Sequence, residues 1–348
     1  MRDRIRRPRR PPLPRPTNAQ EDLERVKAEE SSFAENGTVK EGRIAPFGVD
    51  LKASDAIIDA AVRILREGGI VAVKGLGGFH LACDARNREA LATLRARKRR
   101  GTKPLAAMYP TLDALRKDCL VDNAEERLLT GAQRPIVLLK KRVETHFAEG
   151  LADGLSELGA MLPYTPLQHL LLTAFGGPLV MTSGNLHDEP IQTDGDKAFV
   201  ALHDIADAFV GNNRPIRCRF DDSVVRVIKA GSAGEAVQMV RRARGYAPMP
   251  APLKREAEKN DAQSVIFAAG SEQKNTFCLL RGEEAFVSQH IGDLENAPTY
   301  DAWLEAKNHY ETLFEAQPES IACDLHPEYL ASKWAATAHE NGMPLCKV

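Results

Sequence analysis

Residues 68–84, GGIVAVKGLGGFHLACD, place an apolar strand directly before a lysine and a glycine-rich turn. The run 70–73 is short, apolar and bounded by glycines, which is typical of a buried strand. Gly77 and Gly78 let backbone N–H groups approach an anion closely, and Lys74 adds positive charge. The run lacks the P-loop pattern, and it does not enter a helix as the dinucleotide-binding fingerprint does. It therefore indicates either a plain turn or the anion-binding edge of an α/β sheet.

Helical patterns lie on both sides of this strand. Residues 54–69 predict an amphipathic helix that is capped by Ser54 and stopped at Gly68, and residues 87–100 predict the next helix. Strands are expected at 134–141 and 178–183, helices at 111–118, 123–130, 166–175 and 195–203, and a hairpin over 221–243. Short apolar strands mixed with helices predict an α/β fold with a mixed sheet.

The composition and the pattern of the sequence change after residue 246. Residues 247–263 are rich in proline and charge and predict a linker. The runs SVIFAAG, NTFCLL and EAFVSQHI predict an antiparallel meander, followed by a helix near 299–315, a strand at 320–324 and a helix from Pro327. The predicted organisation is an Arg/Pro-rich arm (1–50), a first domain (51–246), a linker (247–263) and a second region (264–348).

Composition excludes several classes of protein. The 348 residues carry a net charge of −1 and contain no apolar run long enough for a membrane span. Six cysteines without a CxxC pair predict reduced thiols in the cytoplasm and no metal site. The first sixteen residues hold seven arginines and five prolines, so we expect disorder there. This arm is either a solvated tail or an electrostatic arm for nucleic acid.

Three further clusters carry chemistry. In RARKRRGTKP (95–104), Lys98, Arg100 and Lys103 flank the turn that leads back to the sheet. They predict a triphosphate or RNA backbone contact, or simply a solvated helix end.

The other two clusters are VMTSGNLHDEP (180–190) and LGAMLPYTPLQHLL (158–171). Thr182, Ser183 and Asn185 end a strand, and the carboxyl ends of strands are where ligands bind in open α/β sheets. Pro163 and Thr165 precede a helix N-terminus, which is a suitable seat for an anion. Both clusters are also compatible with ordinary turns.

Six motifs in this order resemble the YrdC-like domain of the hydrogenase maturation carbamoyltransferase family (hydrogenase maturation protein F). They are KGLGGFHLACD, ARKRRGTKPLA, RPIVLL, LGAMLPYTPLQHLLL, MTSGN and RPIRCRFDDSVV, with RRARGYAP (241–248) as the domain's end. Residues 270–296 and 323–332 resemble the opening of the same family's Kae1-like domain.

The resemblance implies a YrdC-like twisted mixed open sheet with helices, followed by an incomplete actin-like (Kae1-like) ATPase subdomain. It implies an enzyme that uses ATP, Mg²⁺ and carbamoyl phosphate to make carbamoyl-adenylate, and that passes the carbamoyl group to a cysteine thiol of a partner maturation protein. The residues expected to carry catalysis are Lys98, Arg100, Ser183 and Asn185. The residues expected to bind the nucleotide or carbamoyl group are Lys74, Gly77, Gly78, Lys103, Pro163, Thr165, Thr182 and Arg241.

The sequence departs from the family pattern at four places. No acylphosphatase-like region and no paired CxxC zinc motifs precede the YrdC-like part, and Asn212 stands where the family's histidine is expected. The histidine-rich metal motif expected just after MPLCKV is missing, and His290 and His326 do not have the spacing to replace it. We therefore expect a fragment or one half of a split protein, without the metal site of the Kae1-like domain, which another chain would complement.

Three alternatives stay open. The first is a threonylcarbamoyl-adenylate synthase that acts in tRNA modification, which shares the YrdC-like fold. The second is a non-catalytic module that binds RNA through RARKRR and the arginine arm. The third is an inactive remnant.

Overall fold

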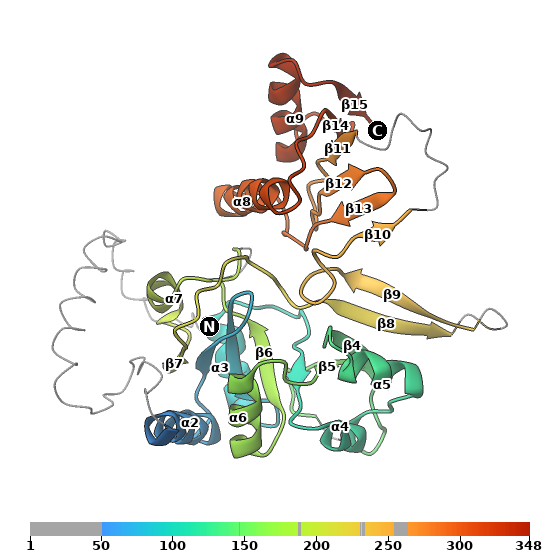
Figure 1. Cartoon of the computed structure of the whole chain (residues 1–348). Helices are drawn as coiled ribbons and strands as arrows, with labels where there is room; N and C mark the ends of the chain where they lie inside the picture. The colour runs from blue at the N-terminus through green and yellow to red at the C-terminus, as the bar shows by residue number, and fades with distance from the viewer. Residues whose placement is uncertain (1–50, 146, 187–188, 230, 232–233, 254–263) are drawn as a thin grey trace, which may run out of the picture. The chain divides into compact units, whose positions relative to one another are not determined.

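The structure is a computed structural model that describes residues 51–145, 147–186, 189–229, 231, 234–253 and 264–348. The predicted arm 1–50 and residues 254–263 of the predicted linker lie outside the described residues. The described residues fall in one compact unit. The described part contains a nine-stranded and a six-stranded sheet, each with its own helices (Figure 1).

The nine-stranded sheet has the order β7-β1-β2-β6-β3-β5-β4-β8-β9. Its strands are β1 (Val71–Lys74), β2 (Phe79–Asp84), β3 (Ala107–Met108), β4 (Ile136–Lys140), β5 (Glu157–Met161), β6 (Leu179–Ser183), β7 (Ala208–Val210), β8 (Val224–Lys229) and β9 (Glu235–Arg241). The pairs β1–β7, β3–β5 and β4–β8 are parallel, and the other neighbours are antiparallel. The predicted mixed sheet is therefore confirmed.

The register of this sheet brings distant motifs together. β1 and β2 form a hairpin around the glycine-rich turn, with Val73 opposite His80. β2 also pairs with β6, which places His80 opposite Ser183. The KGLGGFH and MTSGN motifs are about a hundred residues apart in the sequence. They therefore lie side by side at the ends of neighbouring strands.

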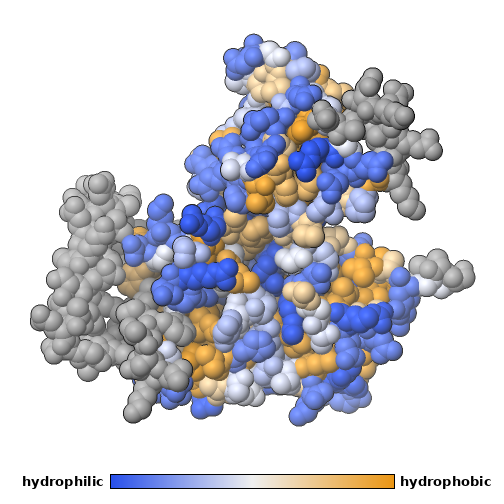
Figure 2. Space-filling model, in the orientation of Figure 1, coloured by the Kyte–Doolittle hydropathy of each residue, from blue (hydrophilic) through white to orange (hydrophobic). Residues whose placement is uncertain are grey.

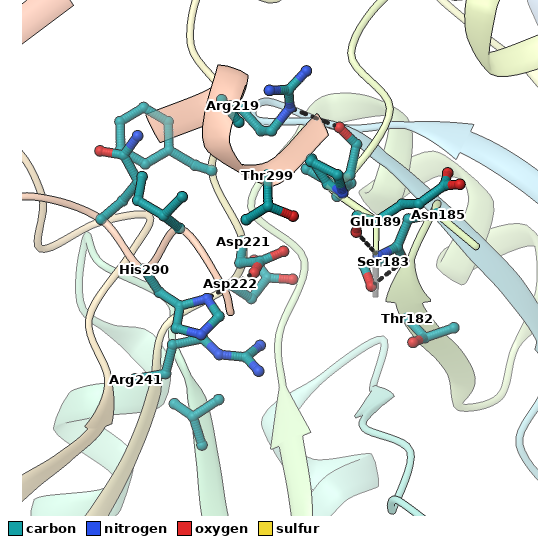
Figure 3. A pocket seen from close by; sticks show the side chains of 18 of the residues that line it. Thr182, Ser183, Asn185, Glu189, Arg219, Asp221, Asp222, Arg241, His290 and Thr299 are labelled. Carbon is teal, nitrogen blue, oxygen red and sulfur yellow. Dashed lines mark hydrogen bonds and ion pairs between the residues drawn. The ribbon is translucent and has the colours of Figure 1, made fainter. Parts of the chain in front are cut away.

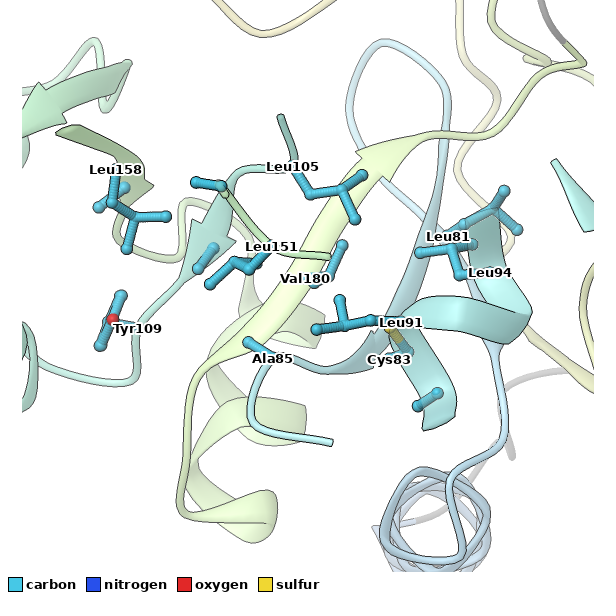
Figure 4. Close-up of a cluster of buried hydrophobic side chains, with 14 of the residues drawn as sticks. Leu81, Cys83, Ala85, Leu91, Leu94, Leu105, Tyr109, Leu151, Leu158 and Val180 are labelled. Atoms are coloured by element: carbon cyan, nitrogen blue, oxygen red, sulfur yellow. The ribbon is translucent and has the colours of Figure 1, made fainter. Parts of the chain in front are cut away.

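Helices cover both faces of this sheet. They are α2 (Leu51–Arg66), α3 (Arg88–Arg97), α4 (Leu112–Asp118), α5 (Asn123–Thr130), α6 (Pro166–Phe175) and α7 (Gly195–Leu202). Because side chains alternate along a strand, Val71 and Val73 pack with residues of α2 and α6, whereas Ala72 packs with residues of α3. The core on the α3 side of the sheet is drawn in Figure 4, where Leu91 and Leu94 of α3 meet Leu81 of β2.

The six-stranded sheet has the order β10-β13-β12-β11-β14-β15. Its elements are β10 (Ala251–Pro252), β11 (Val265–Ala268), β12 (Cys278–Arg281), β13 (Glu284–Val287), β14 (Ser320–Cys323) and β15 (Leu345–Lys347), with the helices α8 (Ala297–Leu313) and α9 (Leu330–Glu340). β11, β12 and β13 form the predicted antiparallel meander. Phe267, Trp303 and Trp334 pack edge to face in its core, at ring-centroid distances of 5.2–5.8 Å.

Several boundaries differ from the predicted ones. The first described helix begins at Leu51, so Ser54 lies inside it rather than at its N-cap. The helix predicted to reach residue 100 ends at Arg97, because Arg99 has a φ of 54° in the left-handed region and cannot continue a helix. β5 was not predicted, and β10 forms inside the segment predicted as a linker because it pairs with β13.

One surface feature of the first sheet is the ribbon of β8 and β9 at its end. Every side chain from Glu235 to Val240 is exposed, and Val237 and Val240 are among the exposed apolar residues. The hydrophobic patch over this ribbon is visible in Figure 2. No helix packs over β9 to bury these side chains in the described part of the chain.

Candidate active site

A cavity of about 860 Å³ lies beyond the carboxyl end of β6. Its walls come mainly from residues 98–106, 181–191, 217–224 and 289–309. Figure 3 shows side chains from the last three of these segments, among them Asn185, Asp221 and His290. Seven of the predicted site residues line this one cavity: Lys98, Arg100, Lys103, Thr182, Ser183, Asn185 and Arg241. Four of these seven are cations, so the cavity suits an anionic ligand.

Lys98 connects α3 to the turn after β6. It is the C-cap residue of α3, and its side chain is buried. Its Nζ donates to Ser183 O at 2.6 Å, to Asn185 O at 2.7 Å and to Asn185 Oδ1 at 2.6 Å. Burial, followed by the charge of Arg100, lowers the pKa of Lys98 to about 7. All three donors of the ammonium therefore hold the Ser183–Asn185 turn.

The turn itself is fixed by short polar contacts. Ser183 Oγ donates to Asn185 Oδ1 at 2.7 Å, and Asn185 Nδ2 donates to Glu189 O (Figure 3). Gly184 donates its N–H to Phe79 O, and a Cβ at this glycine would lie 2.7 Å from that oxygen. Only glycine fits this close approach, so the turn is clamped against the start of β2.

Arg100 and Lys103 form the adjoining wall. Arg100 donates to the backbone oxygens of Lys103 and Pro104, at 3.3 and 2.8 Å. Burial, followed by the charges of Arg95 and Arg241, lowers the pKa of Arg100 to about 10. Within the described residues, no carboxylate lies within ion-pair distance of Lys98, Arg100, Lys103 or Arg241. We call these four residues the cationic rim.

A second charged group is built around Asp222. Asp222 Oδ2 lies 3.0 Å from His80 Nε2, and Asp222 Oδ1 accepts from Arg244 Nε at 2.8 Å. The Arg244 guanidinium lies 3.4 Å from the centre of the Tyr164 ring. Burial alone raises the pKa of Asp222, but Arg244 and His80 outweigh it and hold that pKa well below its ordinary value. His80, Tyr164, Asp222 and Arg244 are called the paired cluster below.

Two features adjoin this cluster. Since a carboxylate only accepts, His80 Nε2 carries the proton of its bond to Asp222, and its Nδ1 is buried with no hydrogen-bond partner in the described part of the chain. Asp221 Oδ2 lies 3.2 Å from His290 Nδ1, which belongs to the segment after β13 (Figure 3). Burial raises the pKa of Asp221, and His290 and Arg241 outweigh it, so the pKa is lowered.

Sequence reasoning did not select His80, Asp221 or Asp222 as site residues, although all three line the cavity. The signal was present, because His80 ends KGLGGFH and both aspartates stand in RPIRCRFDDSVV. Side by side, two acidic residues after an arginine-rich run indicate internal counterions for a basic site.

The structure places five other predicted site residues away from the cavity lining. Lys74 Nζ donates to Asn212 O at 3.0 Å, which ties β1 to the segment after β7. Thr165 is buried as the N-cap of α6 and accepts from Gln168 N at 3.2 Å. Pro163 is buried two residues before it. These three residues connect elements of the sheet and are not part of the wall.

The two remaining residues, Gly77 and Gly78, are explained by close packing. A Cβ at Gly77 would lie 2.5 Å from Phe220 O, and one at Gly78 would lie 2.5 Å from the Ile191 side chain. Glycine is needed there because the turn presses against these two segments and leaves no room for a Cβ atom.

No group of three or more His, Cys, Asp or Glu side chains in the described residues is arranged to hold a metal ion. None of the described helices combines the length and the apolar character needed to cross a membrane.

Comparison with known proteins identifies both sheets. Residues 63–243 match the family model described as Telomere recombination, which covers Sua5, YciO and YrdC proteins, and residues 261–348 match that of the HypF Kae1-like domain. The chain is 46% identical over 318 residues to the carbamoyltransferase HypF2 of Cupriavidus necator, an alignment that covers 86% of this chain and 38% of that protein. It is 43% identical over 288 residues to the carbamoyltransferase HypF of Synechocystis sp., covering 83% of this chain and 36% of the relative.

A solved structure agrees with these relatives. The crystal structure of full-length HypF in the phosphate- and nucleotide-bound form is 46% identical with a TM-score of 0.77, and the match covers 84% of this chain and 44% of that one. The chain thus spans less than half of the length of the relatives it matches. The resemblance predicted from the six motifs is confirmed for both regions.

Proposed function

The chain belongs to the Sua5/YciO/YrdC family and continues into a HypF Kae1-like region, and we propose that its cavity forms carbamoyl-adenylate from ATP and carbamate. The carbamate derives from carbamoyl phosphate. In the complete system the carbamoyl group then passes to a cysteine thiol of a hydrogenase maturation partner.

The observation that supports this proposal most strongly is the cationic rim. Like charges are held together there, and burial together with mutual repulsion lowers the pKa of both Lys98 and Arg100. Such an arrangement is unfavourable until an anion enters, and a polyphosphate supplies the missing negative charge. The related full-length HypF was crystallised in a phosphate- and nucleotide-bound form, which agrees with nucleotide use.

The reaction needs charge stabilisation and alignment rather than a protein nucleophile. A carbamate oxygen attacks the α-phosphorus of ATP, the bond to the bridging oxygen of the β-phosphate breaks, and pyrophosphate leaves. Arg100, Lys103 and Arg241 hold the phosphates as negative charge moves onto pyrophosphate. Lys98 fixes the Ser183–Asn185 turn, so that the hydroxyl and amide groups of that turn orient the carbamate.

Mg²⁺ enters this proposal as part of the nucleotide substrate. Mg²⁺ at nucleotide sites uses one or two carboxylates together with the phosphates. Five carboxylates line the cavity, and we propose Glu189 and Asp221 for this role; the other three are Asp222, Asp293 and Glu305.

The test is ATP–pyrophosphate exchange with labelled pyrophosphate. We expect exchange that depends on carbamate, supplied by ammonium bicarbonate, and that falls at least about 100-fold in Lys98→Met, which corresponds to about 2.7 kcal/mol of transition-state stabilisation. Arg66→Met is the matched control, because Arg66 binds the end of α6 and does not line the cavity.

Two outcomes would overturn the proposal. One is the absence of carbamate-dependent exchange in the folded chain. The other is exchange that requires threonine and bicarbonate, since this result would assign the cavity to threonylcarbamoyl-adenylate synthesis.

A further inference from the structure

One cysteine of the described residues lines the cavity, and a histidine contacts it. Cys218 directly follows the RPIR run before β8, and its Sγ lies 3.0 Å from Nε2 of His309 on α8. His309 lines the same cavity. A thiol within hydrogen-bond distance of an imidazole can act as a nucleophile, because the imidazole takes the proton as the sulfur attacks. The adenylation step described above uses neither side chain.

Two contacts hold the segment around Cys218 against α8. Besides the contact between Cys218 and His309, Arg219 Nη1 lies 3.5 Å from Glu305 Oε2. Glu305 and His309 are four residues apart in α8, so they lie on the same face of the helix. Arg219 Nε also donates to Ile191 O at 3.0 Å. The thiol is therefore held at the cavity wall by elements from distant parts of the sequence.

The Cys218 thiol is partly buried and protonated at rest. Burial raises its pKa, so little thiolate is present at neutral pH. A neutral thiol attacks only when a base removes its proton, and His309 is within reach to do so. The pair therefore suits an activated acyl group, which a thiol attacks once its proton is taken.

A second feature of the cavity wall indicates the kind of ligand. Gln289 lines the cavity and is only 5% exposed, and its Oε1 is buried without a hydrogen-bond partner in the described part of the chain. Burial raises the pKa of Tyr310, and both the Gln289 backbone and the Cys218 side chain also act on it, so both lie close to that ring. An unpaired buried acceptor is unfavourable until a donor reaches it, and a carbamoyl group offers N–H donors.

We propose that Cys218 accepts the carbamoyl group inside the cavity, with His309 as the general base and Gln289 as the acceptor for the carbamoyl N–H. This inference rests on the proposed function, because carbamoyl-adenylate is the donor. Cys218 Sγ attacks the carbonyl carbon, and its proton moves to His309 Nε2. The bond between that carbon and the phosphate oxygen of AMP breaks, and AMP leaves with the electron pair. An S-carbamoyl group remains on Cys218 until an external thiol takes it.

The test is mass spectrometry of the full chain after incubation with ATP, Mg²⁺ and ammonium bicarbonate and an acid quench. Carbamoyl phosphate is left out, because the cyanate that it releases modifies thiols without an enzyme. We expect one carbamoyl group on the Cys218 peptide, which becomes heavier with carbon-13 bicarbonate and is absent without ATP. Cys218→Ser should abolish it. Cys278→Ser is the matched control, since Cys278 is also partly buried but does not line the cavity.

Two further variants test the roles of the neighbours. His309→Gln should slow formation of the S-carbamoyl group about 100-fold, because the general base is lost. His339→Gln is its control, since His339 is exposed on α9 and does not line the cavity. Gln289→Leu should slow formation about tenfold, because the buried acceptor for the N–H is removed.

ATP–pyrophosphate exchange in the same sample separates this inference from the proposed function. Exchange without a carbamoyl group on Cys218 overturns the inference and leaves the proposed function standing. The absence of carbamate-dependent exchange overturns both. Equal modification of several cysteines, or an unchanged rate in His309→Gln, also overturns the inference, because either result indicates chemical carbamoylation without the cavity.

Discussion

The paired cluster and the cationic rim border the same cavity, but they differ in how their charges are balanced. In the paired cluster, Asp222 accepts from His80 and Arg244, and its pKa is lowered because both partners favour the carboxylate. In the rim, Lys98 and Arg100 face other cations and backbone oxygens, and their pKa values are lowered because their charged forms are disfavoured. A lowered pKa thus has opposite meanings for the two groups.

The difference separates stability from ligand binding. The paired cluster is complete as it stands and connects β2, the segment before β8 and the segment after β9. The rim has no carboxylate within ion-pair distance among the described residues, and Asp221 offsets its positive charge only in part, so a bound anion makes these charges more favourable. We expect substitutions in the cluster to act mainly on folding, and substitutions in the rim to act mainly on nucleotide chemistry.

The largest expected effect is on the cluster. Asp222→Asn removes a buried carboxylate and leaves Arg244 without its counterion, which should lower the free energy of unfolding by about 3–5 kcal/mol. Urea unfolding followed by circular dichroism measures this change. Glu305→Gln is the control, because the Glu305–Arg219 pair is long, at 3.5 Å, and Glu305 is exposed; it should change stability by less than about 1 kcal/mol. A loss below about 1 kcal/mol for Asp222→Asn would contradict the assignment of the paired cluster to stability.

The second effect tests the rim. Arg100→Met keeps an aliphatic side chain but removes a cation without a carboxylate partner. We expect carbamate-dependent ATP–pyrophosphate exchange to fall about 100-fold, with the free energy of unfolding unchanged within about 1 kcal/mol. Arg116→Met is the control, since Arg116 pairs with Glu126 far from the cavity lining. If Arg100→Met unfolds the chain as Asp222→Asn does, the rim is also structural.

The third effect lies on the connection between the two groups. Gly184→Ala adds a Cβ at 2.7 Å from Phe79 O, so the Ser183–Asn185 turn must move away from β2. We expect a loss of about 1–3 kcal/mol in unfolding free energy, together with weaker exchange activity. Gly101→Ala is the matched control, because its Cβ would meet no atom within 4 Å. Equal stability of the two alanine variants would show that the turn has room to shift.

The rim was largely predictable from the sequence, whereas the cluster was not. Lys98, Arg100, Ser183 and Asn185 stand in local motifs whose residue types already indicate an anion site. His80 and Asp222 are 142 residues apart, and only the register of β1, β2 and β6 together with the course of the chain before β8 brings them together. Nothing local to either residue indicates its partner.

The predicted site residues that lie away from the cavity lining show the same limit. Thr165 begins TPLQ, and a threonine followed three residues later by glutamine is a capping box that the sequence alone could have indicated. Lys74 and Gly77 offered no such signal, since their environments depend on Asn212 and Phe220 from the far end of the domain. The central strands were predictable as short apolar runs, because both faces of β1, β2 and β6 are buried.

The last effect is a pH dependence that arises from Lys98. Its pKa is lowered to about 7 in the free protein, so its positive charge is lost as the pH rises through neutrality. A bound polyphosphate favours the ammonium and raises this pKa, so ATP binding takes up a proton and weakens as the pH rises from 7 to 9, by up to about tenfold per pH unit. Titration of the nucleotide itself acts in the other direction, because its γ-phosphate gains negative charge with rising pH. For folding, the unfolded chain binds this proton more tightly than the folded one, so the contribution of Lys98 to stability increases between its folded pKa and 10.5.

Isothermal titration calorimetry in buffers of different ionisation enthalpy measures the proton uptake on ATP binding. Lys98→Arg should remove it, because a guanidinium stays charged throughout this range; persistence of the uptake in that variant would assign it to another group.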